Sequence, residues 1–110
     1  MTFDEYQKLA SRTINKALTD TDKEAHALLG LASETGELLG LYQKSMQGHG
    51  FVDEHMLKEC GDILWMLAEL LTAGGHTLEE VAVMNIDKLK ARYPDGFDTE
   101  HSLHRKVNDV

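Results

Sequence analysis

Apolar residues recur at every third or fourth position over long stretches of the chain, and the strongest helix breakers fall between these stretches. Glycines gather around residues 48–50, 74–75 and 96, and the one proline is Pro94. A period of three to four residues is typical of amphipathic helices, whereas no segment shows the sustained β-branched alternation of a strand. The pattern predicts four helices, over about residues 3–18, 21–47, 53–73 and 78–92.

Three of these helices begin with a threonine followed three residues later by a glutamate, which is the pattern of a capping box. The pairs are Thr2 with Glu5, Thr21 with Glu24 and Thr77 with Glu80. Helices joined by short connections are expected to pack as antiparallel neighbours. We therefore expect an all-α, four-helix bundle-like domain over residues 1–97. A polar tail over residues 98–110 has no apolar face, and we expect it to be loosely held or used in assembly.

The composition narrows the class of protein. The chain has 110 residues, a net charge of −8 and 42% hydrophobic residues, which fits one folded soluble domain. It has no basic stripe for a nucleic acid polymer and no apolar run near the ~20 residues of a membrane span. Acids near the amino terminus do not fit a signal peptide, so we expect a cytoplasmic protein. Cys60 lies in an apolar stripe, and we expect it to be buried.

Two acidic pairs are the main candidates for chemistry: Glu34 with Glu37, and Glu59 with Asp62. A spacing of three places both carboxylates of a pair on one side of a helix. If the second and third helices form an antiparallel hairpin, the pairs face each other. Four clustered carboxylates repel one another unless divalent cations lie among them, and oxygen ligands suit Mg²⁺, Mn²⁺ or Ca²⁺ rather than zinc.

Two observations bear on whether these acids are simply solvated, as most helical acids are. Apolar residues cover most of the circumference around the first pair, which leaves little solvent-facing surface for it. Gly36 and Gly61 lie inside the pairs, and a glycine within a helix suggests a close approach to the backbone. No glutamate has a histidine three residues later, which argues against a di-iron centre.

A cationic stripe lies on the last predicted helix, where Asn85, Lys88 and Arg92 are spaced by three and four residues. Lys and Arg near a helix carboxyl terminus are also favoured by the helix dipole alone. Beside a metal cluster, however, an arginine, a lysine and an amide suit the outer phosphates of a nucleotide. Lys44, on the same side of its helix as Glu37, is a further candidate for binding phosphate.

These motifs occur in the order found in the MazG-like nucleotide pyrophosphohydrolases of the all-α NTP pyrophosphatase superfamily, which the chain resembles from its first helix to about Phe97. The resemblance implies hydrolysis of a nucleoside or deoxynucleoside triphosphate between its α and β phosphates. It implies Mg²⁺, or Mn²⁺ as the alternative, held by the four acids. Glu34 is our candidate for the general base, although the motif does not separate a ligand from a base. Asn85, Lys88 and Arg92 resemble the family's phosphate or sugar contacts.

The resemblance also implies a homodimer or homotetramer in which helices of neighbouring subunits complete the bundle and sometimes the site. Apolar residues on several sides of the second helix agree with this expectation. Trp65 and Tyr42 are candidates for stacking on a base, although a lone tryptophan on an apolar helix is more often part of the core. The alternative function is a catalytically silent helical module that binds a structural cation or a protein partner.

Overall fold

The computed structural model describes all 110 residues and is entirely helical, which confirms the predicted fold class. A short 3₁₀ turn follows the first helix, and the predicted bounds of the third helix are confirmed. The elements are α1 (Phe3–Ala10), η1 (Ser11–Thr13), α2 (Asp20–Met46), α3 (Asp53–Ala73), α4 (Leu78–Arg92) and α5 (Thr99–Leu103). None of these helices combines the length and the apolar composition that crossing a membrane requires.

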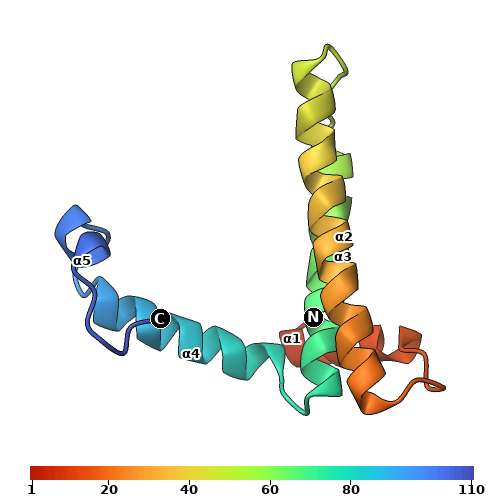
Figure 1. Ribbon diagram of the computed structural model, residues 1–110, viewed down its shortest axis with the longest axis horizontal. Helices are drawn as coiled ribbons and strands as arrows, with labels where there is room; N and C mark the ends of the chain where they lie inside the picture. Colours follow the sequence, from red (N-terminus) through yellow and green to blue (C-terminus); the bar gives the residue numbers. More distant parts are fainter.

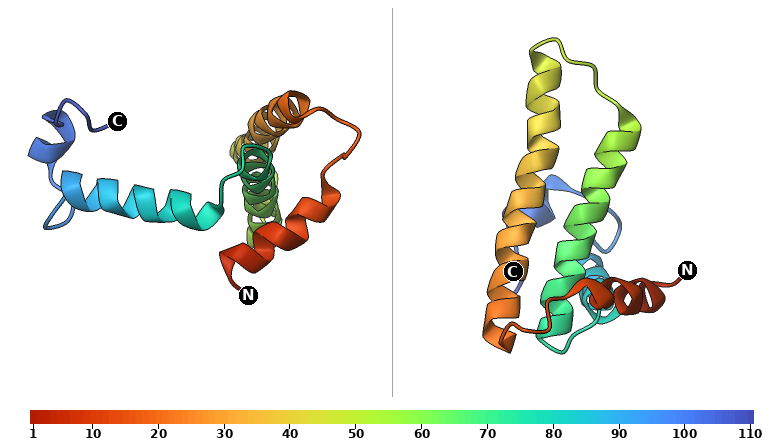
Figure 2. Two further views of the ribbon diagram at one scale, coloured as in Figure 1. Left: turned by 90° about the horizontal axis from the view of Figure 1, so that it is seen from below. Right: turned by 90° about the vertical axis from the view of Figure 1, so that its right-hand side faces the viewer.

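An antiparallel hairpin of α2 and α3 forms one arm of an L-shaped molecule, and α1 lies across its open end (Figures 1 and 2). The other main packing partner of α1 is α4, which leads away from the hairpin (Figure 1). Gln7 fixes this corner: its amide donates to Thr72 Oγ1 and to the carbonyl of His76, and its oxygen accepts from the amide of Leu78. The expected antiparallel packing of a fourth helix on the hairpin is therefore not made within one chain.

Local hydrogen bonds explain where the helix ends differ from the predictions. The capping boxes at Thr2 and Thr77 are confirmed. The predicted start at Thr21 was wrong, because Thr19 caps α2 by accepting a hydrogen bond from the amide of Asp22. The first helix is shorter than predicted, since side chains around residues 11–15 bond to the backbone and compete with the helix.

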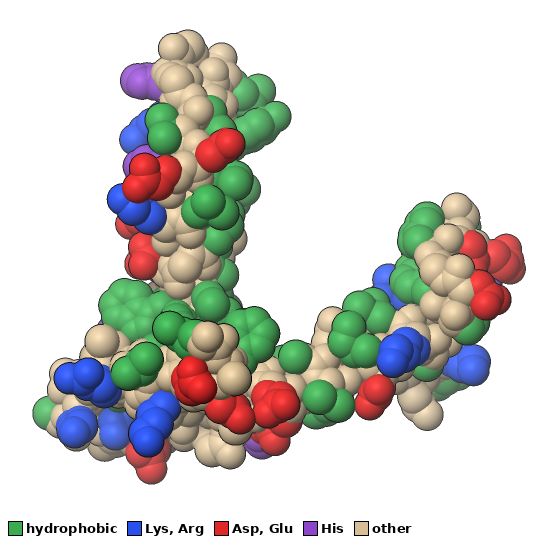
Figure 3. Space-filling view, turned by 180° about the vertical axis from the view of Figure 1, so that it is seen from behind, with side chains coloured by type: hydrophobic (Ala, Val, Ile, Leu, Met, Phe, Trp, Pro, Cys, Tyr) green, Lys and Arg blue, Asp and Glu red, His purple; other side chains and the backbone are tan.

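The single chain buries little of its apolar surface. Only seven residues are buried, and the radius of gyration is 17.2 Å, against about 13 Å for a compact domain of this length. Hydrophobic side chains are exposed along the flank of the hairpin that faces α4 in Figure 3. Exposed positions on α2, α3 and α4 include Leu28, Leu29, Leu39, Tyr42, Met46, Leu57, Val83, Met84 and Ile86. Cys60 is also exposed, so the prediction of a buried cysteine was wrong.

Candidate metal centre

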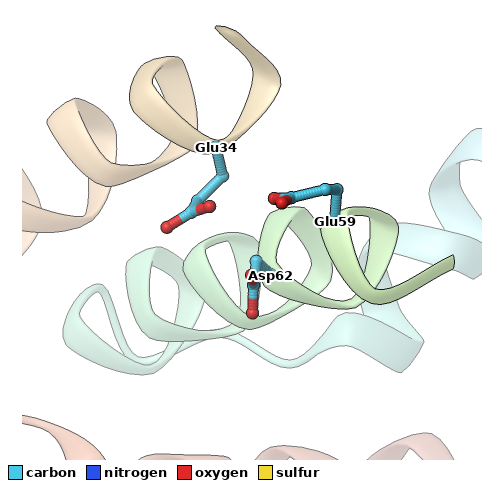
Figure 4. A group of neighbouring side chains, drawn as sticks. All are labelled: Glu34, Glu59 and Asp62. Carbon is cyan, nitrogen blue, oxygen red and sulfur yellow. The ribbon is translucent and has the colours of Figure 1, made fainter. Parts of the chain in front are cut away.

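Three of the four predicted acids come together in the groove between α2 and α3. Glu34 projects from α2, and Glu59 and Asp62 project from α3 (Figure 4). One oxygen from each of the three carboxylates lies within 4.8 Å of the other two. The hairpin forms the cluster because three-residue spacing places Glu59 and Asp62 on the same side of α3.

Burial makes this cluster electrostatically unfavourable without a cation. Glu34 Oε2 and Glu59 Oε2 are both buried and have no hydrogen-bond partner. Burial raises the pKa of Glu34, and the charges of Glu37, Asp62 and Glu59 raise it further. Buried polar atoms without partners are rare in folded proteins. A hard divalent cation would satisfy both orphaned oxygens, and the all-oxygen donor set fits Mg²⁺ or Mn²⁺.

Glu37 lies next to this group but outside it. Its side chain is exposed, and it affects the site by raising the pKa of Glu34. The role of Glu37 as a fourth ligand stays a prediction.

The glycines inside the acidic pairs do not mark a close approach within the chain. A Cβ atom added at Gly36 or Gly61 would meet nothing within 4 Å. The close contact is at Gly30 instead, where an added Cβ would overlap the sulfur of Met66. Gly30 thus allows α2 and α3 to approach each other about one turn from Glu34.

The predicted cationic stripe forms one wall of a cleft at the far end of α4. Asn85, Lys88 and Arg92 all line this cleft, so the expected shared face is present. The opposite wall comes from the tail, and Arg92 is hydrogen-bonded there to Asp109. Because α4 leads away from the hairpin, the stripe and the acids of one chain do not form a single site (Figure 1).

The remaining candidates lie outside the acidic cluster. Lys44 is exposed near the end of α2, about 15 Å along the helix from Glu34 at 1.5 Å per residue. Tyr42 is 64% exposed on the same helix. Trp65 is partly buried, and its Nε1 donates a 2.8 Å hydrogen bond to Thr13 Oγ1. That bond gives Trp65 a packing role against η1.

Two residues near the acids were missed by the sequence reasoning. His55 Nε2 lies 3.3 Å from Glu59 Oε1, and the spacing of four residues on one helix was a signal for this contact. Tyr6 lies on α1, and its pKa is raised by burial and then by the charge of Asp62. No local pattern predicts this proximity, because it depends on how α1 crosses the hairpin.

The comparison with protein families agrees with this geometry. The family model for the MazG nucleotide pyrophosphohydrolase domain matches residues 23–97, a range that contains both acidic pairs and the cationic stripe. Helix α1 and the tail lie outside the match. No curated protein and no solved structure matches the chain. On the family match, which covers most of its length, the chain belongs to the MazG nucleotide pyrophosphohydrolase domain family.

Proposed function

We propose that this chain hydrolyses a nucleoside or deoxynucleoside triphosphate to a monophosphate and pyrophosphate in a reaction that depends on Mg²⁺. The observation that carries the proposal is the group formed by Glu34, Glu59 and Asp62, in which two buried carboxylate oxygens have no partner. A group of this kind fits a chain of a pyrophosphohydrolase family. Mn²⁺ is the alternative ion.

Each acid has a proposed role. Glu34, Glu59 and Asp62 hold the cation, and Glu37 completes the set. When bound, the cation supplies positive charge that lowers the pKa of a coordinated water and neutralises charge developing on the phosphoryl oxygens. Glu34 is the proposed general base that accepts the proton of the attacking water, because it lies in the acidic group beside the proposed cation site. The water oxygen forms a bond to the α or β phosphorus as the bond from that phosphorus to the α,β-bridging oxygen breaks, and the monophosphate and pyrophosphate leave.

The phosphate contacts are proposed to come from a second copy of the chain. Asn85, Lys88 and Arg92 share one cleft, but α4 carries them away from the acids of their own chain. A homodimer or homotetramer would cover the exposed apolar flank and bring this stripe to a neighbour's carboxylates. In such an assembly Lys44 is a further phosphate contact, and Tyr42 is better placed than Trp65 to stack on a base.

Product analysis tests the proposal. The full chain is incubated with each common nucleoside and deoxynucleoside triphosphate, with Mg²⁺ or with a chelator, and the products are separated. We expect equal amounts of monophosphate and pyrophosphate from at least one substrate, and only with Mg²⁺. Release of diphosphate and inorganic phosphate would contradict the assigned bond. No product from any substrate, with the fold intact, would favour the silent binding module instead.

A further inference from the structure

The tail supplies an internal ligand for Arg92. Arg92 Nε donates a 2.7 Å hydrogen bond to Asp109 Oδ2, and Nη2 donates a 2.6 Å bond to Oδ1. The two side chains are only 10% and 12% exposed. Paired N–H bonds of this geometry are also the ones with which arginine binds phosphate. Asp109 therefore occupies the donors that a substrate phosphate would use.

The surroundings of this pair are strongly basic. Lys88, Arg105 and Lys106 line the same cleft of about 880 Å³. The pKa of Asp109 is lowered, first by the hydrogen bonds from Arg92 and then by the charges of Arg92, Arg105 and Lys88, against the opposing effect of burial. In a protein with a net charge of −8, this is a local concentration of positive charge suited to a polyanion.

Little else holds the tail in place. Asp98 caps the short α5 by accepting a hydrogen bond from the amide of His101, which orders the first part of the tail. Beyond α5, the side chain of Val107 is 97% exposed, so apolar burial does not anchor this segment. The Arg92–Asp109 pair is therefore the main tertiary contact that holds this segment. A competing anion that binds Arg92 would break it.

We propose that the tail is an autoinhibitory latch: Asp109 blocks Arg92 until the phosphate groups of a nucleotide displace it. The inference rests on the proposed function in taking Arg92 as a phosphate contact. Displacement is favourable because a polyphosphate carries several charges where Asp109 carries one, and it can bind Lys88 and Arg92 together. Only chains in which Asp109 has left Arg92 can bind the phosphate groups. The apparent Kd for the substrate is therefore the intrinsic Kd divided by the fraction of chains in this state.

Binding of inorganic triphosphate to the full chain, with a chelator present to remove divalent cations, tests the latch separately from catalysis. Calorimetry gives the affinity, and NMR follows the Arg92 Nε–H resonance. We expect Asp109→Asn to bind triphosphate about five-fold more tightly than the unaltered chain. Asp109→Glu, which keeps the carboxylate, and Asp95→Asn, which removes an exposed charge outside the cleft, should both stay close to the unaltered chain.

Equal affinity of Asp109→Asn and the unaltered chain would overturn the latch, as would a triphosphate complex in which Arg92 keeps the resonance of its bond to Asp109. Nucleotide hydrolysis separates this result from the proposed function. A latch predicts a lower KM and an unchanged kcat in Asp109→Asn. If no variant hydrolyses a nucleotide but Asp109→Asn binds triphosphate more tightly, the proposed function fails and the latch stands.

Discussion

An oxygen of Glu34 on α2 and an oxygen of Glu59 on α3 lie within 4.8 Å of each other, and each carboxylate has an oxygen that is buried without a hydrogen-bond partner. Two negative charges at this separation, largely removed from water, push the helices of the hairpin apart. A divalent cation between them would turn this repulsion into a link between α2 and α3. The stability of the hairpin should therefore depend on the metal.

Glu59→Gln should change the free energy of unfolding differently in the absence and in the presence of metal. Without metal, the variant should be as stable as the unaltered chain or more stable, because one repelling charge is removed. At a Mg²⁺ concentration 100 times its Kd, the unaltered chain should gain about 2.7 kcal/mol in free energy of unfolding, and the variant should gain little. Thermal unfolding with Mg²⁺ or with a chelator measures both effects.

Glu54→Gln is the matched control, because it removes the same charge from an exposed position on α3 that pairs with Lys58. It should retain the stabilisation by Mg²⁺. A large loss of metal-free stability in Glu59→Gln, not seen in Glu54→Gln, would show instead that Glu59 is a structural acid.

The glycines of α2 should respond in opposite directions to substitution by alanine. Gly36→Ala should stabilise the chain by up to about 1 kcal/mol, because nothing lies near the added methyl group and alanine favours a helix. Gly30→Ala should destabilise it by about 1–3 kcal/mol, because the methyl group meets Met66. Urea unfolding at one protein concentration measures both changes. Destabilisation by Gly36→Ala would show that another body, such as a second copy, packs there.

The fold was predictable wherever local signals agreed. The bounds of α3 follow from an uninterrupted apolar stripe between breakers, and Thr77 with Glu80 gives the start of α4. The end of the first helix was not predictable from apolar periodicity, because side-chain hydrogen bonds near Thr13 compete with the helix. The placement of α4 was not predictable either, since its apolar face has the same pattern whether it packs on its own chain or on another.

The candidate site was also predictable only in part from the sequence. Spacing on one helix predicted that Glu59 and Asp62 would lie together, and the hairpin brought Glu34 to them. The spacing did not predict that Glu37 would be exposed and would lie outside the group of three. The contact between Arg92 and Asp109 depends on the return of a polar tail, for which no periodicity exists.

Acidification should release the tail from α4. The pKa of Asp109 is held below its ordinary value of 3.8, mainly by the hydrogen bonds from Arg92. A carboxyl group with a lowered folded-state pKa contributes stability that is present above the ordinary value and is lost as the pH falls through the folded value. Arg92, Arg105 and Lys88 line the cleft around Asp109, and His101 and His104 line it as well.

The chemical shift of Arg92 Nε–H is the measurement for this pH effect. It should stay constant from neutral pH down to about the ordinary carboxyl value and then move to the shift of Asp109→Asn. A resonance that already equals that of Asp109→Asn at neutral pH would show that the pair is not formed.

Mixing two inactive variants should restore activity if the site is shared between copies. Arg92→Ala keeps the acids, and Glu59→Gln keeps the cationic stripe. In a 1:1 mixture of exchanging dimers, half the dimers are mixed and each has one intact site, so about a quarter of full activity should return. Pyrophosphate release before and after subunit exchange gives the result. An inactive mixture that contains mixed dimers would place the stripe and the acids of each site on the same chain.

Pyrophosphate release as a function of Mg²⁺ concentration, compared among the unaltered chain, Glu59→Gln and Glu54→Gln, tests the central claim most directly. The acidic group predicts saturable dependence on Mg²⁺ in the unaltered chain and in Glu54→Gln. It predicts a loss of at least about 100-fold in Glu59→Gln, since even outer-shell partners of a metal typically contribute 10–100-fold. Release that is independent of Mg²⁺, or full activity in Glu59→Gln, would contradict it.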